Sequence, residues 1–157
     1  MENKIENFTK IRADGKIIPD QEDFNIFKLG WEPCKIVAVY WNYNGRRVEF
    51  HDDSETGIRL DYVKELNMIV FLKSLNTEPN PCFMTVYNAD GSIRFRIPNV
   101  QKIRGIEREG KFLWLVDYTD EYPGHYGVVF QVDDYNAMYN ILFDLETGET
   151  EFLSEAR

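Results

Sequence analysis

The residues best suited to bind a cation lie in one short stretch, TVYNADGSIRFRIP, at positions 85–98. Asn88, Asp90 and Ser92 place oxygen-bearing side chains at alternate positions around a glycine. A calcium loop of the familiar kind needs glycine at its sixth position and glutamate at its twelfth. Counted from Asn88, the glycine is fourth and the twelfth residue is Asn99. The stretch therefore predicts a hairpin turn and not a metal site.

The sequence FHDD is a second candidate, because a histidine beside carboxylates can act as a general base or a metal ligand. Adjacent residues of a strand point to opposite faces, so of this group only His51 and Asp53 can converge. The one other histidine, His125, is distant in sequence, and two such histidines make a weak metal site. We interpret FHDD as the polar end of a strand. A small-molecule-binding or enzymatic site inside a curled sheet, near His51 or His125, stays open as an alternative.

Other catalytic signatures are missing from the sequence. None of the four serines lies in G-x-S-x-G, and no glycine-rich phosphate loop occurs. Cys34 and Cys82 have no C-x-x-C or Cys/His spacing, so we read them as two buried, reduced thiols, with a disulfide as the alternative. The sequence predicts no catalytic residue, no cofactor and no metal, and we expect a protein that is not an enzyme.

Length and composition indicate a folded protein. The 157 residues suit a single domain, 1–157, that can bury a core without disulfides or metals. A hydrophobic fraction of 43%, with 11 Phe, 9 Tyr and 3 Trp, excludes a disordered chain. The N-terminus has no apolar signal segment, and the apolar runs are too short to span a membrane. We expect a soluble, cytoplasmic protein with no membrane partner.

Alternating apolar residues bounded by turn residues predict strands from residue 35 onward. Hairpins are expected with tips at Asn44-Gly45, Glu109-Gly110 and Thr147-Gly148, and in the two Ala-Asp-Gly segments at 9–19 and 85–98. The predicted fold is mainly β: an antiparallel meander of about nine or ten strands, forming a curled sheet, a half-barrel or a two-layer sandwich.

Helix is expected to be scarce. The segment at 19–30 predicts one short N-terminal helix, since Asp20 can cap its start and Gly30 follows its end. Residues 60–67 could form a further turn or two of helix. The segment at 134–143 fits both periods, and we favour a strand for its second half.

The negative charge is concentrated in the last third of the chain. Residues 1–111 contain 17 acidic and 17 basic residues, whereas residues 112–157 contain ten acidic residues and one basic residue, Arg157. This third therefore carries the whole net charge of −9. Such a region can attract a positively charged partner and repels nucleic acid. The alternative is that solvated strand faces and turns are simply acidic there.

Two stretches in this third combine acidic residues with tyrosines, namely 117–126 and 133–139. Tyrosine offers a broad contact area and a hydroxyl at little entropic cost, and it is enriched at protein interfaces. The sequence therefore predicts a partner-binding surface. Its residues are Asp117, Tyr118, Asp120, Glu121, Tyr122, Asp133, Asp134 and Tyr135.

A basic segment at 94–111 precedes these stretches, with Arg94 and Arg96 on one face of a predicted strand. A domain of pI about 4.7 lacks the electrostatic footprint of a nucleic-acid-binding protein. We therefore expect no nucleic-acid partner, and expect these arginines to pair with acids on neighbouring strands or to stay solvated.

Small size, acidic charge and missing catalytic signatures together favour a binding protein. In size and charge the chain is similar to bacterial immunity proteins, including those of contact-dependent inhibition systems. That resemblance is one of composition, and it implies a toxin inhibitor that binds and neutralises a basic protein partner. An interaction module within a larger assembly is a third possibility, and the sequence predicts no oligomeric state.

Overall fold

The computed structural model describes residues 4–19, 35–52, 54, 57–75, 83–132 and 137–156. These residues form antiparallel strands and one short 3₁₀ helix, so the prediction of a mainly β, antiparallel fold is confirmed. No helix in this part of the chain is long and apolar enough to cross a membrane. The elements are β1 (Glu6–Arg12), β2 (Ile17–Pro19), β3 (Ile36–Tyr43), β4 (Arg46–His51), β5 (Leu60–Val63), η1 (Lys64–Leu66), β6 (Met68–Phe71), β7 (Phe83–Asn88), β8 (Ile93–Pro98), β9 (Val100–Ile103), β10 (Ile106–Val116), β11 (His125–Val132), β12 (Met138–Asp144) and β13 (Thr150–Glu155).

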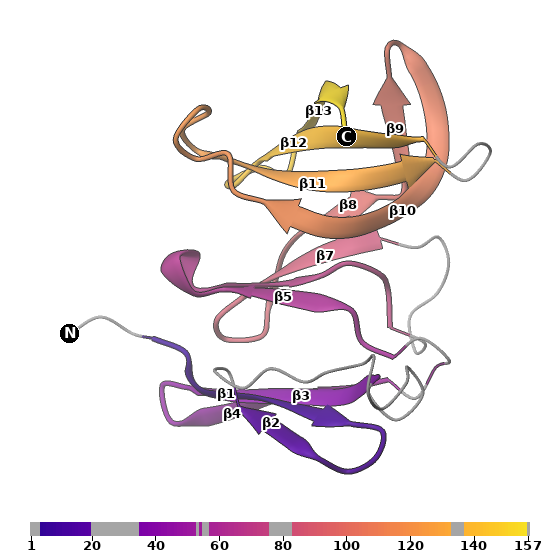
Figure 1. Ribbon diagram of the computed structural model, residues 1–157. Coiled ribbons are helices and arrows are strands. Elements are labelled where there is room, and N and C mark those ends of the chain that lie inside the picture. Colours follow the sequence, from indigo (N-terminus) through magenta and orange to yellow (C-terminus); the bar gives the residue numbers. More distant parts are fainter. Residues whose placement is uncertain are drawn as a thin grey trace.

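The strands form three sheets, which lie as three layers in Figure 1. The N-terminal sheet has the order β2-β1-β3-β4, and the middle sheet has the order β5-β6-β7-β8. The third sheet, β13-β12-β11-β10-β9, curls into a half-barrel over the middle sheet (Figure 1). The half-barrel is one of the shapes expected from the sequence. The strands outnumber the expected nine or ten because short strands such as β5 and β9 carry too little alternation to be recognised.

Most of the predicted hairpins are present. Asn44 and Gly45 both have positive φ, at 52° and 76°, as the tip between β3 and β4 requires. The two Ala-Asp-Gly segments form the β1–β2 and β7–β8 hairpins. In the second, the amide N–H of Ser92 donates to Asp90 Oδ1 at 2.9 Å, and Asn88 Nδ2 donates to Ser92 Oγ at 3.0 Å. The alternating oxygens of this stretch therefore serve the turn itself.

The predicted turn at Glu109-Gly110 is wrong. The chain reverses instead at Arg104-Gly105, where both residues have positive φ, and β10 continues through Gly110 without interruption. A Cβ atom at Gly110 would clash with the carbonyl oxygen of Gln131 in β11. This glycine thus allows two strands of the half-barrel to approach closely, which is a common reason for glycine within a strand.

The helix predictions have mixed outcomes. Only residue 19 of the predicted N-terminal helix at 19–30 is described, so the helix prediction is not tested. Both cysteines, Cys34 and Cys82, also lie outside the described residues. Residues 60–67 form strand β5 followed by the single turn η1. The preferred strand in the second half of 134–143 is confirmed as β12.

The middle sheet is buried on both faces, and this gives the protein two hydrophobic cores. Met68 and Val70 of β6 belong to the core beneath the half-barrel, whereas Ile69 and Phe71 belong to the core against the N-terminal sheet. All four side chains are at most 1% exposed. Full burial of side chains of this size contributes roughly 1.5–3 kcal/mol each. The middle sheet thus holds the two outer layers together.

A polar joint connects the middle sheet to the half-barrel. Strand β10 pairs with β9 only from Ile106 to Glu109, so the later part of this edge has no strand beside it. The guanidinium of Arg59 donates to the carbonyl oxygen of Leu113 there, at 3.0 Å. The carboxylate of Asp61 accepts from the backbone N–H of Leu115. The two side chains therefore take the place of a neighbouring strand along this edge. Burial raises the pKa of Asp61, although the Leu115 N–H and the nearby Lys10 and Arg59 act in the opposite direction.

This joint predicts how Asp61 affects stability as pH changes. A raised folded-state pKa means that the ionised carboxylate weakens folding above that pKa, and that this cost disappears as the pH falls below the ordinary value near 3.8. The free energy of unfolding of D61N, relative to that of wild type, should therefore be higher at pH 7 than at pH 3, because the amide carries no charge to bury. Its oxygen can still accept from the Leu115 N–H. Urea unfolding at both pH values measures this difference.

D61A is the matched control for the hydrogen bond. It leaves the Leu115 N–H without its acceptor and should lower the free energy of unfolding by about 1 kcal/mol relative to D61N. If the difference between D61N and wild type is the same at both pH values, the carboxylate is not destabilised by burial.

Candidate protein-binding surface

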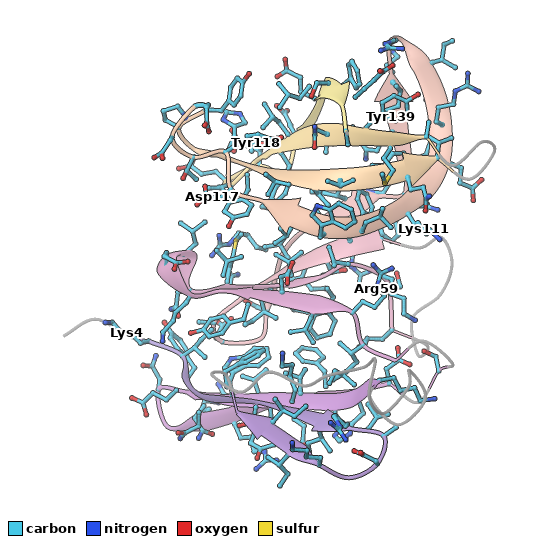
Figure 2. All side chains as sticks on the ribbon, in the orientation of Figure 1. Lys4, Arg59, Lys111, Asp117, Tyr118 and Tyr139 are labelled. Carbon is cyan, nitrogen blue, oxygen red and sulfur yellow. The ribbon has the colours of Figure 1, made fainter. Side chains whose placement is uncertain are left out.

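The acidic loop, residues 117–124, joins β10 to β11 at one end of the half-barrel. Asp117 and Tyr118 mark this end in Figure 2. Inside the loop, the Tyr122 N–H donates to the Tyr118 carbonyl at 2.7 Å, and the His125 N–H donates to the Tyr122 carbonyl at 3.0 Å. The Leu145 N–H of the β12–β13 turn donates to the Gly124 carbonyl at 2.9 Å. The loop is therefore ordered internally and attached to the next turn.

Asp117 fixes the first bend of the loop. Its Oδ1 atom accepts from the Thr119 N–H at 2.9 Å and from the Thr119 hydroxyl at 2.6 Å. These bonds, the hydroxyl first, lower the pKa of Asp117 below its ordinary value. The side chain is thus held in place and stays ionised at neutral pH.

Tyr118 lies on the outer face of the half-barrel, over a glycine. A Cβ atom at Gly127 would overlap the ring of Tyr118, so only glycine at this position leaves room for the ring. The ring also meets Tyr122 edge to face, with 6.2 Å between the ring centroids. Gly127 thus allows the loop to lie close against β11.

Asp120 and Glu121 are the exposed acidic residues at the tip of the loop. Neither makes an ion pair with any residue that the structure describes. Their charges are therefore not neutralised by these residues and can act on a partner.

Further acidic residues that the sequence analysis missed lie near the acidic loop. Burial raises the pKa of Tyr126, and the negative charges of Asp117, Glu65 and Asp61 raise it further, so these groups lie near one another. Figure 1 shows η1, which carries Glu65, at the same end of the molecule as the loop. Only the packing of the middle sheet under the half-barrel brings Glu65 to this place.

The β12–β13 turn adds acidic residues to the same end. Asp144 Oδ2 lies 3.8 Å from His125 Nε2, next to the acidic loop, and the turn also carries Glu146 and Glu149. The sequence contained a usable signal here, since all three residues belong to the acidic last third.

The other predicted site residues, Asp133, Asp134 and Tyr135, lie outside the described residues. Val132, the last described residue before them, is at the opposite end of β11 from the acidic loop. At about 3.3 Å per residue, the two ends of this strand are roughly 23 Å apart. The two predicted stretches can therefore be tested separately.

The alternative site near the histidines gains no support from this packing. His51 is 67% exposed and lies 3.2 Å from Glu49, while its neighbour Asp52 is buried. His125 is 36% exposed, and its Nδ1 lies 3.1 Å from the Pro123 carbonyl. Apolar side chains fill the interior of the half-barrel, among them Phe112, Phe130, Ile141 and Phe143.

The basic segment is engaged within the fold. Arg94 Nε donates to Asn88 Oδ1 at 2.7 Å, and the Arg96 guanidinium lies 5.8 Å from the centre of the Phe83 ring. Arg104, in the turn between β9 and β10, forms an ion pair with Glu155 of β13 at 2.7 Å.

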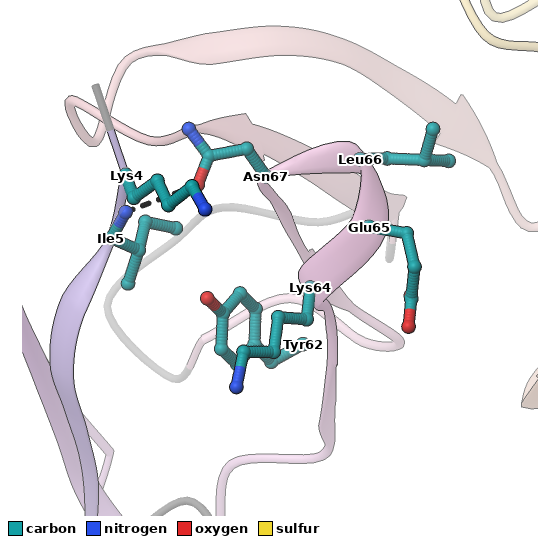
Figure 3. Close-up of a pocket in the computed structure, with 7 residues that line it drawn as sticks. All are labelled: Lys4, Ile5, Tyr62, Lys64, Glu65, Leu66 and Asn67. Carbon is teal, nitrogen blue, oxygen red and sulfur yellow. Dashed lines mark hydrogen bonds between the residues drawn. The ribbon is translucent and has the colours of Figure 1, made fainter. Parts of the chain in front are cut away.

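A hollow of about 410 Å³ lies beside η1 (Figure 3). One rim is closed by the Ile5 N–H, which donates to Asn67 Oδ1 at 3.1 Å. No Ser–His or Cys–His pair is present among its lining residues, so it offers no activated nucleophile. Among the described residues, no group of three His, Cys, Asp or Glu could hold a metal ion. The lining residues are Lys4, Ile5, Tyr62, Lys64, Glu65, Leu66 and Asn67.

Comparison with known proteins identifies a similar structure. No protein-family model matches the chain, and no curated protein matches it. A chain in the solved structure of Tne2 in complex with Tni2 superposes on it with a TM-score of 0.76 and 22% sequence identity. The two chains share one fold. The match covers 98% of this chain and 99% of that chain, so the similarity includes all three sheets.

The contact of the Tyr118 ring with Gly127 predicts that substitutions at these two residues have non-additive effects on stability. G127A should lower the free energy of unfolding by about 1–3 kcal/mol, because the new methyl group must displace the ring. In a Y118A background, G127A should lower the free energy of unfolding by much less. A double-mutant cycle from urea unfolding measures the coupling, and strictly additive costs would show that the ring does not rest on Gly127.

Proposed function

We propose that this chain is a non-enzymatic inhibitor that binds and neutralises a basic protein partner, as immunity proteins do. The observation that carries the proposal is the acidic loop. It is a hydrogen-bonded element with exposed carboxylates that no described residue neutralises and with tyrosines, and it lies at one end of the half-barrel. A surface that is ordered before binding loses little conformational entropy when a partner binds.

Electrostatics define the kind of partner. Asp117, Asp120 and Glu121 lie in one loop, and Glu65 adds a further negative charge nearby. A partner with Lys and Arg on its binding face would be attracted at long range and oriented on approach. A basic toxin domain has this chemistry.

The structural comparison supports a protein partner. The similar chain was solved in a complex of two proteins, Tne2 with Tni2, and the similarity extends over nearly the whole of both chains. We further infer that residues 1–157 act as one domain, since the middle sheet contributes side chains to both cores.

Reversal of the loop charges tests the function. D120K/E121K should abolish capture of a basic partner in a pull-down at low salt, and should weaken binding of the purified partner roughly 10-fold or more. The fold should be unchanged because both side chains are exposed. The wild-type interaction should also weaken as salt is raised.

E107K/E109K is the matched control, because it makes the same change in net charge on exposed residues at the other end of β10. It should retain most of the affinity. Equal losses in the two double variants would mean that net charge alone drives binding. Unchanged affinity in D120K/E121K would exclude the acidic loop as the binding surface.

A further inference from the structure

Trp114 is the most exposed tryptophan in the described part of the chain, at 50%, and a β-bulge directs it outward. Phe112 of β10 pairs with Phe130 and is buried in the core, and regular alternation would bury residue 114 on the same side. The register shifts between these two residues, so Trp114 instead pairs with Val129. A bulge re-aims the side chains that follow it.

The direction of β11 confirms that Trp114 is on the outer face. Val128 and Phe130 belong to the core, so the residues that alternate with them, Gly127 and Val129, lie on the other face of the sheet, where Val129 is covered and only 3% exposed. Val116 pairs with Gly127, the glycine on which Tyr118 rests. The outer face therefore carries an aromatic row, which we define as Trp114, Tyr118 and Tyr122.

The polar joint anchors the bulge. Leu113 is the extra residue of the bulge, and Arg59 donates to its carbonyl oxygen. Asp61 accepts from the N–H of Leu115, two residues further on. The outward position of Trp114 is therefore fixed by the middle sheet and is part of the folded structure.

Charge changes sign along this face. Asp117 directly follows β10 and Lys111 lies in the middle of that strand, and Figure 2 shows the two residues on opposite sides of the half-barrel. Trp114 lies between them in sequence and lines a hollow that also contains Lys10, Arg59 and Asp61. Tyr122, at 39% exposure, lies within the acidic loop. Aromatic faces in a negative field attract the cationic head groups of Arg and Lys. The end of the row that contains Tyr118 and Tyr122 is therefore complementary to a basic surface, and Trp114 extends it as an exposed aromatic face.

We propose that the outer face of the half-barrel, with Trp114 as its anchor, binds Arg or Lys side chains of the basic partner. This proposal rests on the proposed function and extends the binding surface from the acidic loop along β10. From Trp114 to Tyr118 the row spans roughly 13 Å, which fits within a protein–protein interface of ordinary size.

A synthetic hexa-arginine peptide is a defined probe of this surface. In ¹⁵N-labelled protein, titration should shift the indole N–H signal of Trp114 and the amide signals of residues 117–122. The indole of Trp41 is buried and donates to the Ala89 carbonyl at 2.6 Å, so its signal should stay in place. A W114F variant assigns the Trp114 signal.

Three substitutions then separate the aromatic contribution from the acidic one. W114A should weaken peptide binding about 2- to 5-fold, the range of an exposed cation–π contact, whereas W114F should retain most of it. K111E should strengthen binding. I106A, which removes another exposed apolar side chain of β10, should have no effect.

The outcomes distinguish this inference from the proposed function. If D120K/E121K abolishes binding but W114A and K111E leave it unchanged, the acidic loop binds alone and the role of Trp114 is wrong. If the peptide shifts neither Trp114 nor the loop, the outer face is not a site for basic side chains, whether or not a protein partner is captured.

Discussion

Burial of the middle sheet on both faces is the constraint on which the rest of the structure depends. Each residue of β6 is buried, and successive side chains enter different cores. A strand buried on both sides must be apolar throughout, and MIVF satisfies this. Because β6 and β7 contribute side chains to both cores, a loss of packing in one core should also destabilise the other.

This arrangement determines which surfaces remain for function. The half-barrel turns its inner face to the middle sheet, so Trp114 on its other face and the acidic loop meet solvent. The same contact places Arg59 and Asp61 at the free edge of β10, where they hold the bulge. Packing within the core thus sets the direction of Trp114 and the position of the acidic loop, and these two features form the surface that we assign to a partner.

Local chemistry was predictable from the sequence and long-range contacts were not. Asn44-Gly45 specifies its hairpin because few other residue pairs accept two positive φ angles, and the acidic loop was identified from its composition alone. Gly110 was mistaken for a turn residue because a glycine required by a neighbouring strand looks the same in sequence as one required by a turn. Glu65 and Trp114 were missed for a related reason. The stacking of the sheets brings Glu65 near the acidic loop, and a register shift turns Trp114 outward. Neither effect can be recognised from the neighbouring residues in the sequence.

We propose that Trp114 and the acidic loop of the half-barrel form a binding surface for a basic protein that is ordered before the partner arrives. Hydrogen exchange of the chain, free and with its captured partner, measures whether this surface is covered. We expect protection to increase at residues 114–124 and to stay unchanged in the N-terminal sheet. Increased protection confined to β1–β4, with the half-barrel unaffected, would contradict it.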